Sequence, residues 1–204
     1  HGLLANMRAH EIVDEYTITH VPPPDQKHFK FADQLIQSKN SFLKPVQTPM
    51  SQIFDVMHFP GTGEHGRKLD KYYFFAKSGK TPGKCVGLFF VEHVPPNPNG
   101  PIARALQPGT EIATPHMSLA PEFQRAGIAL QCYSTFLASG KWVFLTKEHT
   151  QSANALWNRL VTAGNLSVYL GKSQSGEWVT SQDPIPNGHR MLGPKERFNL
   201  GTAI

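Results

Sequence analysis

The fold of this chain is decided by Leu119-Ala120-Pro121-Glu122-Phe123-Gln124-Arg125-Ala126-Gly127-Ile128-Ala129, where an apolar strand turns into a helix. Backbone N–H groups at a helix start have no partner inside the helix and carry partial positive charge, so they can bind a phosphate without a basic side chain. Gly127 lacks a Cβ and Ala129 is small, which lets a phosphate come close, while Ile128 points into the core. The segment therefore predicts a phosphate-binding turn.

The spacing Q-x-x-G-x-A in this segment resembles motif A of the GNAT superfamily of N-acetyltransferases. Gln124, Gly127 and Ala129 occupy the motif positions, and Leu119 and Pro121 form the apolar-x-Pro element that precedes it. The structural alternative is a tight strand-to-helix turn whose small residues serve packing alone. The pattern is short, so its meaning depends on the rest of the chain.

The composition favours one soluble domain in a reducing compartment. The chain has 204 residues, 39% hydrophobic and 17% charged, and no apolar run long enough to cross a bilayer. Its first residues indicate a processed end rather than a signal peptide. Cys85 and Cys132 lie in apolar patterns, which favours buried free thiols. We expect a cytoplasmic protein that makes no membrane contact.

The charge of the chain is compatible with several anionic partners. The formal net charge of +5 and the pI near 9.3 fit coenzyme A, an acidic protein surface or nucleic acid. Lysine and arginine are scattered, and no dense basic run is interleaved with aromatic residues. Charge alone therefore does not choose among these partners, and the sequence leaves the oligomeric state open.

The order of predicted elements comes from periodicity and turn signals. A long irregular connection is expected at residues 95–108. The elements are a strand at 16–21, short helices at 29–36 and 53–57, a hairpin of 71–76 and 85–91, a strand at 111–119, the motif helix, a strand at 141–146, a helix from 150 or 152 to 163, and a hairpin of 166–170 and 177–180.

This order is similar to the GNAT fold, which implies a single α/β domain with a mixed, mostly antiparallel central sheet flanked by helices. The expected division is an N-terminal extension at 1–15, a GNAT-like acetyltransferase domain at 16–180 and a polar C-terminal tail at 181–204 that packs on the domain. The motif and the element order are separate observations, and they agree.

The resemblance implies acetyl-CoA as the cofactor. Its pyrophosphate would sit on the amides of Gln124 to Ala129, and the thioester carbonyl would face the amide of Leu119, with further backbone contacts at Met117. Arg125 would add a phosphate contact, although a solvated arginine fits equally well. The implied cofactor-binding set is Met117, Leu119, Gln124, Arg125, Ala126, Gly127, Ile128, Ala129 and Trp157.

A second family element, N-x-x-A-x-x-L-Y, is only half preserved. Thr150, Ala153, Leu156 and Trp157 occupy its positions. The family's tyrosine protonates the departing thiolate, and an indole N–H is too weak an acid for that role. Tyr133 is the substitute in the predicted catalytic set; Tyr169 and water are alternatives, and both tyrosines also fit core positions.

Direct transfer of an acetyl group to an amine also needs a general base. His116 is the first candidate because imidazole titrates near neutrality and the residue lies three positions before Leu119. Glu92 is the second. Glu111 and the pair Glu148-His149 are further options, and a structural histidine remains the competing interpretation of His116.

Other chemistries have weaker support, so no metal site is expected. His58, His65 and His93 are too far apart in sequence to argue a site, and no H-x-x-x-H, C-x-x-C or P-loop occurs. The sequence thus predicts an acetyl-CoA-dependent N-acetyltransferase whose acceptor is an amine of a protein or small molecule. The alternatives are a GNAT-like protein acting on or binding nucleic acid or a nucleic-acid-bound protein, and a catalytically lapsed GNAT-fold binder.

Overall fold

The computed structural model describes residues 26–63, 66–95, 100–124, 126–146, 151–164, 166–171, 178–179 and 190–199. The chain divides into two compact units. We call residues 20–93 and 115–135 the motif unit, and residues 1–19, 94–114 and 136–204 the C-terminal unit. The predicted strand at 16–21 and the extension at 1–15 lie outside the described residues.

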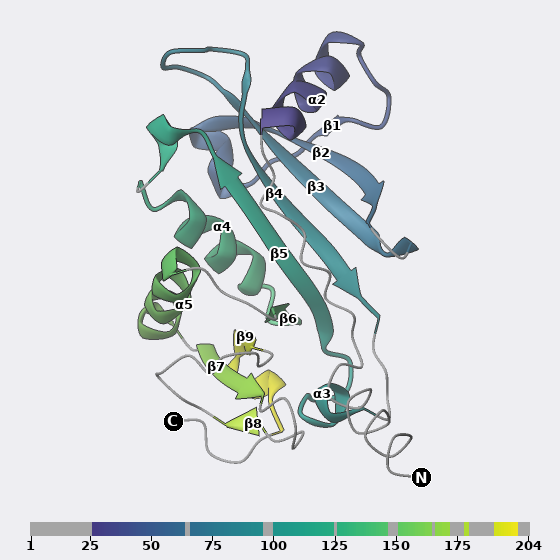
Figure 1. Cartoon of the computed structure of the whole chain (residues 1–204), viewed down its shortest axis with the longest axis vertical. Helices are drawn as coiled ribbons and strands as arrows, with labels where there is room; N and C mark the ends of the chain where they lie inside the picture. The colour runs from purple at the N-terminus through teal and green to yellow at the C-terminus, as the bar shows by residue number, and fades with distance from the viewer. Residues whose placement is uncertain are drawn as a thin grey trace, which may run out of the picture. The chain divides into compact units, whose positions relative to one another are not determined.

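The motif unit is built on antiparallel strands (Figure 1). The predicted hairpin is confirmed, since β3 and β4 pair in antiparallel register from Leu69↔Glu92 to Phe74↔Gly87. Strand β5 ends at Leu119 beside the start of β4, where the N–H of the next residue, Ala120, donates to the Val86 carbonyl at 2.7 Å. The strands are β1 (Lys44–Pro45), β2 (Phe54–Thr62), β3 (Lys68–Ala76), β4 (Cys85–Val94) and the second half of β5 (Glu111–Leu119).

Each face of these strands has its own helix, because consecutive residues point to opposite faces. On one face, α2 (Gln26–Gln37) buries Phe29, Ala32 and Leu35. These side chains share a core with Tyr73, Phe75, Leu88 and Phe90. On the other face Phe89 packs on Tyr133 of α4 (Ile128–Leu137), with ring centroids 5.4 Å apart. We call these the α2 face and the α4 face.

The predicted helix at residues 53–57 is wrong. A 3-10 turn at Pro49–Gln52, closed by a capping box between Thr48 and Ser51, precedes strand β2. Phe54 and Val56 are buried and alternate with exposed or half-buried neighbours, which is the strand period. The apolar residues of this short segment fit both periods, and pairing with β3 decides for the strand.

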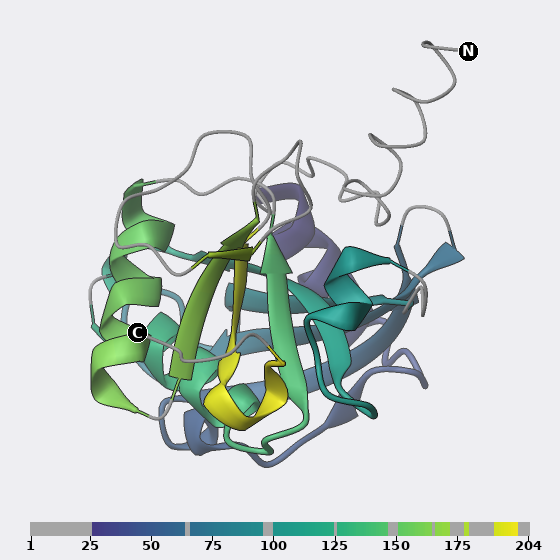
Figure 2. The ribbon, with the colours of Figure 1, turned by 90° about the horizontal axis from the view of Figure 1, so that it is seen from below.

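The C-terminal unit holds the rest of the sheet. The first residues of β5 pair in parallel with β6 (Trp142–Thr146), and β9 (Arg190–Pro194) pairs antiparallel with both β6 and β7 (Leu166–Gly171). Figure 2 shows β9 in yellow between these two strands. The segment predicted as a polar tail therefore supplies an inserted strand, and all of β9 is buried.

The helices of this unit follow the prediction except for a short helix in the connection expected to be irregular at residues 95–108. The predicted helix at the second family element is α5 (Gln151–Ala163), and the connection before β5 contains α3 (Pro101–Arg104). The predicted closing hairpin is confirmed, as β7 pairs with β8 (Trp178–Val179). The core joins Val94, Ile102, Ala105, Leu106, Ile112, Val143, Leu145, Tyr169, Met191 and Phe198.

The predicted fold class is confirmed. In the described part of the chain, nine strands hydrogen-bond in the order β1-β2-β3-β4-β5-β6-β9-β7-β8. The pair β5 and β6 is parallel, whereas the pairs β1–β2, β2–β3, β3–β4, β6–β9, β7–β9 and β7–β8 are antiparallel, which makes the sheet mixed and mostly antiparallel. Cys85 and Cys132 are free and buried, as predicted. No helix among the described residues has the length and apolar character that crossing a bilayer requires.

Candidate functional site

At the end of β5, some backbone N–H groups point toward β4 and others point to the opposite edge of the strand. Since the Ala120 N–H bonds to β4, strand alternation directs the backbone N–H groups of Met117 and Leu119 to the opposite edge. The parallel register with β6 covers Glu111 to Ala113, and β5 continues beyond it to Leu119. The backbone groups that the resemblance assigns to the thioester thus lie on the edge that β4 does not use.

The turn after β5 is held by local bonds and by aromatic packing. The Gln124 side-chain amide donates to the Leu119 carbonyl at 2.9 Å, so the motif glutamine ties the turn to the strand end. Phe123 packs edge-on against Phe54 with centroids 5.0 Å apart, and Phe54 stacks on Phe74 at 5.3 Å. The turn is therefore anchored by aromatic packing on the α4 face of β2 and β3.

Two glycines make this arrangement sterically feasible. A Cβ on Gly87 would stand 2.7 Å from Cδ2 of Leu119 and 3.0 Å from Cδ2 of Phe74, so glycine lets the Leu119 side chain cross β4. Gly127 has φ +76°, a conformation that other residues rarely adopt, and a Cβ there would meet nothing within 4 Å. The structure thus requires Gly127 for its backbone conformation, and the space beside it is open.

Helix α4 begins directly after Gly127. The first helical hydrogen bond runs from the Gln131 N–H to the Gly127 carbonyl at 3.0 Å. The amides of Ile128 and Ala129 precede that bond, which leaves them as helix-start donors. Ile128 is 3% exposed and faces the core, as predicted. Ala126 is exposed and Ala129 half-buried, whereas Arg125 lies outside the described residues.

The predicted bases lie on the α2 face. Leu119 reaches Phe74 on the α4 face, so strand alternation puts His116 on the other side of β5. Burial lowers the pKa of His116, which keeps its imidazole neutral at pH 7. Glu92 follows the alternation of Leu88 and Phe90, and its Oε1 lies 3.4 Å from Nη1 of Arg67. The structure does not bring His116 or Glu92 to the face of α4.

The predicted proton donor, Tyr133, lies on the buried face of α4. Tyr133 is 7% exposed, and burial raises the pKa of its phenol well above the ordinary value. Its hydroxyl therefore stays protonated at neutral pH, the form that a donor needs. The thiol of Cys132, on the same helix, has its pKa raised to about 12 by burial, so it is a poor nucleophile.

The second family element lies in the C-terminal unit. Trp157 is 3% exposed in α5 and packs as a core residue, while Thr150 lies outside the described residues. Tyr169 is buried with its ring 4.6 Å from that of Phe198. For Tyr169 this is the core position given as its alternative role, and Trp157, expected in the cofactor-binding set, has its side chain buried.

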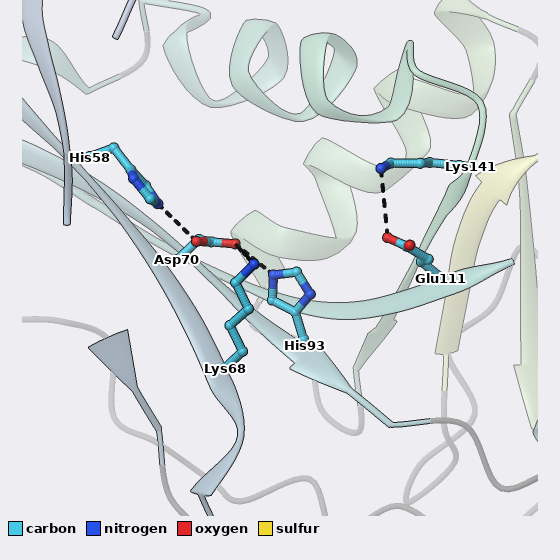
Figure 3. A network of polar contacts seen from close by, with 6 residues as sticks. All are labelled: His58, Lys68, Asp70, His93, Glu111 and Lys141. Carbon is cyan, nitrogen blue, oxygen red and sulfur yellow. Dashed lines mark hydrogen bonds and ion pairs between the residues drawn. The ribbon is translucent and has the colours of Figure 1, made fainter. Parts of the chain in front are cut away.

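One group of titratable residues was missed in the sequence. His58, Asp70 and His93 come from β2, β3 and β4, and each imidazole Nε2 meets one carboxylate oxygen, at 2.8 Å for His58 and 2.6 Å for His93 (Figure 3). We call these three residues the Asp70 cluster. The separation of His58 and His93 in sequence argued against any shared site, and the strand register brings them together. Among the described residues, no set of three potential ligands is arranged to hold a metal.

Diagonal pairing across the strands forms the Asp70 cluster. Asp70 pairs with Pro60 and Val91, and His58 and His93 each lie two residues from those partners. Burial alone would raise the pKa of Asp70. Hydrogen bonds from both imidazoles and the charge of Lys68 together lower it by more, so the net pKa lies below its ordinary value. The carboxylate is therefore ionised at neutral pH. The signal in the sequence was the presence of titratable residues within each of three largely apolar strands.

Comparison with known proteins gives structural neighbours only. No family model matches the chain. No curated protein matches it either. Similar solved structures include a GNAT-family acetyltransferase from Bacteroides thetaiotaomicron, with a TM-score of 0.35, 11% identity and coverage of 85% of this chain and 86% of that one.

A second similar structure is an acetyltransferase from Salmonella typhimurium that modifies the N-terminal serine of 50S ribosomal subunit protein L7/L12. It has a TM-score of 0.35, 13% identity and coverage of 84% of this chain and 90% of that one. Both neighbours are named as acetyltransferases, and the first is named as a member of the GNAT family. A TM-score of 0.35 carries no argument about function, which rests on the chain's own residues.

Proposed function

We propose that this chain is a cytoplasmic, acetyl-CoA-dependent N-acetyltransferase that transfers an acetyl group directly to an amine. One observation carries the proposal: β5 ends with the Leu119 N–H directed away from β4, and the chain then turns through Gly127 into the start of α4. Residues 120–127 join the strand edge to the helix start, with open space at Gly127. This is the arrangement that a thioester followed by a pyrophosphate requires.

The backbone supplies the binding groups in this proposal. The amides of Ile128 and Ala129 would hold the pyrophosphate, because they lack helical partners and lie at the positive end of the helix dipole. The Leu119 amide would polarise the thioester carbonyl. Gln124 would act indirectly, through its bond to the Leu119 carbonyl. Acetyl-CoA contributes the activated acyl group.

The chemical step needs a base for the amine and an acid for the thiolate. Tyr133 is the acid proposed from the sequence; burial keeps its proton in place but also raises its pKa, which makes it a weaker acid than an exposed phenol. His116 and Glu92 remain the sequence-derived bases. Substitution of each by alanine tests them, and unchanged turnover in both variants would reject both.

Calorimetry with acetyl-CoA tests the cofactor proposal. Gly127→Trp should lower the affinity at least about 100-fold, because the indole would fill the open space at the helix start. Gly140→Trp is a matched control: Gly140 has the same φ of +76°, has open space around its Cβ position and lies beyond the far end of α4. Affinity should change less than threefold there. Failure of the unmodified protein to bind acetyl-CoA would contradict the proposal.

A turnover screen then separates the alternatives. Phenethylamine, spermidine and an unblocked alanyl peptide represent small-molecule and protein amines as acceptors. Binding of acetyl-CoA without acetylation of any acceptor would favour a catalytically lapsed binder. Tight binding of single-stranded or duplex nucleic acid that weakens steeply with salt would favour the nucleic-acid alternative.

A further inference from the structure

We propose that the Asp70 cluster is the proton acceptor for the amine substrate, with His58 as the base and with Asp70 and His93 as positioning residues. The inference rests on the proposed N-acetyltransferase function. It assigns a role to titratable groups that form no part of the cofactor site.

The Asp70 carboxylate determines which nitrogen of each imidazole carries the hydrogen. An ionised carboxylate only accepts hydrogen bonds, so Nε2 of His58 and Nε2 of His93 must both be donors. In the neutral ring Nδ1 is then the acceptor. A carboxylate that orients an imidazole in this way also stabilises the imidazolium that forms when the ring takes a proton. The geometry is therefore that of a prepared base.

Of the two rings, His58 has the simpler surroundings. Within the part of the chain that the structure describes, its ring meets Asp70 through Nε2 and lies 5.0 Å from the ring of Tyr72. The His58 side chain is 25% exposed, which permits contact with a solute. His93 holds the second carboxylate oxygen and thereby fixes the rotamer of Asp70.

The cluster shares a sheet face with the motif. The rings of Tyr72 and Phe89 stack with centroids 6.4 Å apart, and Phe89 contacts Tyr133 of α4 at 5.4 Å. A continuous aromatic row thus leads from His58 to the helix that follows the motif. His116 and Glu92 lie on the opposite face, behind the sheet.

The strand register sets the separation. Gly87, which Leu119 covers, and Val91, the partner of Asp70, are four residues apart on β4. At ~3.3 Å per residue this is about 13 Å. The distance is too long for proton transfer within the bond-forming step. The ammonium group is instead deprotonated as the acceptor enters, before attack.

Few charged groups face the cluster. Lys68 Nζ lies 3.9 Å from the second Asp70 oxygen and is 65% exposed. Burial and the Asp70 charge raise the pKa of Tyr72, so its hydroxyl stays protonated. Arg67 and Glu92 pair with each other on the other face. With neutral rings, Lys68 and Asp70 offset one another, and the first added proton makes the cluster cationic.

The protons balance as follows. The ammonium of the acceptor gives one proton to Nδ1 of His58, which leaves a neutral amine and an imidazolium. The amine nitrogen then forms a bond to the thioester carbon, the carbon–sulfur bond breaks, the thiolate takes the phenol proton of Tyr133, and the second amine proton restores that phenol. The imidazolium releases its proton to solvent.

Activity measurements with His58→Gln test the assignment. With the fastest of the three acceptors above, we expect kcat/KM to fall about 100-fold at pH 7, because only about one in a thousand alkylamine molecules is neutral at that pH without a base to take the proton. The rise of kcat/KM with pH should flatten, and the acetyl-CoA affinity should stay within twofold. His93→Gln and Asp70→Asn should lower kcat/KM about tenfold, because positioning is lost. His28→Gln, a histidine on α2, is the matched control and should leave the profile unchanged. A His58→Gln profile with the unmodified rise would overturn the proposal.

A second readout does not depend on turnover. Long-range proton–nitrogen correlation spectra of the imidazoles should show the Nε2–H form for His58 and His93, and Asp70→Asn should mix the tautomers. Finding the Nδ1–H form at His58 in the unmodified protein would overturn the inference whether or not acetyl-CoA binds. Absence of acetyl-CoA binding would contradict the proposed function alone. Circular dichroism establishes that each variant is folded.

Discussion

The turn from Leu119 to Ala129 and the Asp70 cluster are two candidate sites built in opposite ways. In the turn, the proposed functional groups are backbone amides of neighbouring residues, and Gly127 and the Gln124 side chain set the backbone conformation. In the cluster, the proposed functional groups are the side chains of His58, Asp70 and His93, which strand register alone brings together. A backbone site should therefore tolerate most side-chain changes, whereas a side-chain site should not.

The largest expected effect on stability comes from the Phe54 ring, on which the turn packs. Phe54→Ala removes a fully buried ring that contacts both Phe74 and Phe123, so the free energy of unfolding should fall by about 3–5 kcal/mol. Urea denaturation measures the change. Phe42→Ala is a matched control because Phe42 is 64% exposed, and its change should stay within about 0.5 kcal/mol. Equal losses in the two variants would show that the turn does not depend on Phe54.

An intermediate effect is expected at the side-chain site. Asp70→Asn removes the charge that accepts hydrogen bonds from both imidazoles, and it should lower the unfolding free energy by about 1–2 kcal/mol at pH 7. Asp55→Asn on β2 is the control, because Asp55 is 67% exposed and pairs only loosely with Lys77, at 3.9 Å.

The same variant should also change the acid dependence of stability. The folded-state pKa of Asp70 lies below its ordinary value of 3.8. Its contribution is therefore complete above about pH 4 and is lost as the pH falls below 3.8 through the folded value. Urea titrations at pH 6 and pH 3 should show a smaller acid loss in Asp70→Asn than in the unmodified protein. An identical acid loss would mean that Asp70 does not take part.

The smallest effect is expected at the motif glutamine. Gln124→Ala removes one exposed bond to the Leu119 carbonyl, which should cost about 0.5–1 kcal/mol of stability. Acetyl-CoA affinity should fall less than about fivefold, since the amides remain. Calorimetry measures this, and a loss as large as that of Gly127→Trp would show that the Gln124 side chain binds the cofactor itself.

The same difference explains how much the sequence could predict. The strand at 111–119, the hairpin before it and the start of α4 were predictable because their signals are local: apolar runs, turn residues and a glycine. The helix expected at 53–57 failed because a short apolar segment fits both periods, and its pairing with β3 is a long-range fact. Strand β9 was missed since its residues carry no alternation, and burial between two strands makes that pattern continuous.

The candidate site divides along the same line. The motif could be located from six residues, because a backbone site needs only the right local conformation. Strand alternation alone puts His116 and Leu119 on opposite faces of their strand, but the faces that Glu92 and the helices take could not be predicted, because they depend on the pairing of distant strands. The Asp70 cluster joins residues 58, 70 and 93, and nothing local in the sequence links them.

The most direct test of the central claim is an amide proton–nitrogen titration of the protein with acetyl-CoA. If backbone amides form the cofactor site, the largest shifts will fall on Gly127, Ile128 and Ala129, with a second set at Met117 and Leu119. Coenzyme A without the acetyl group should reproduce the first set and reduce the second. If the amide signals of residues 117–129 do not shift while others do, the account is contradicted.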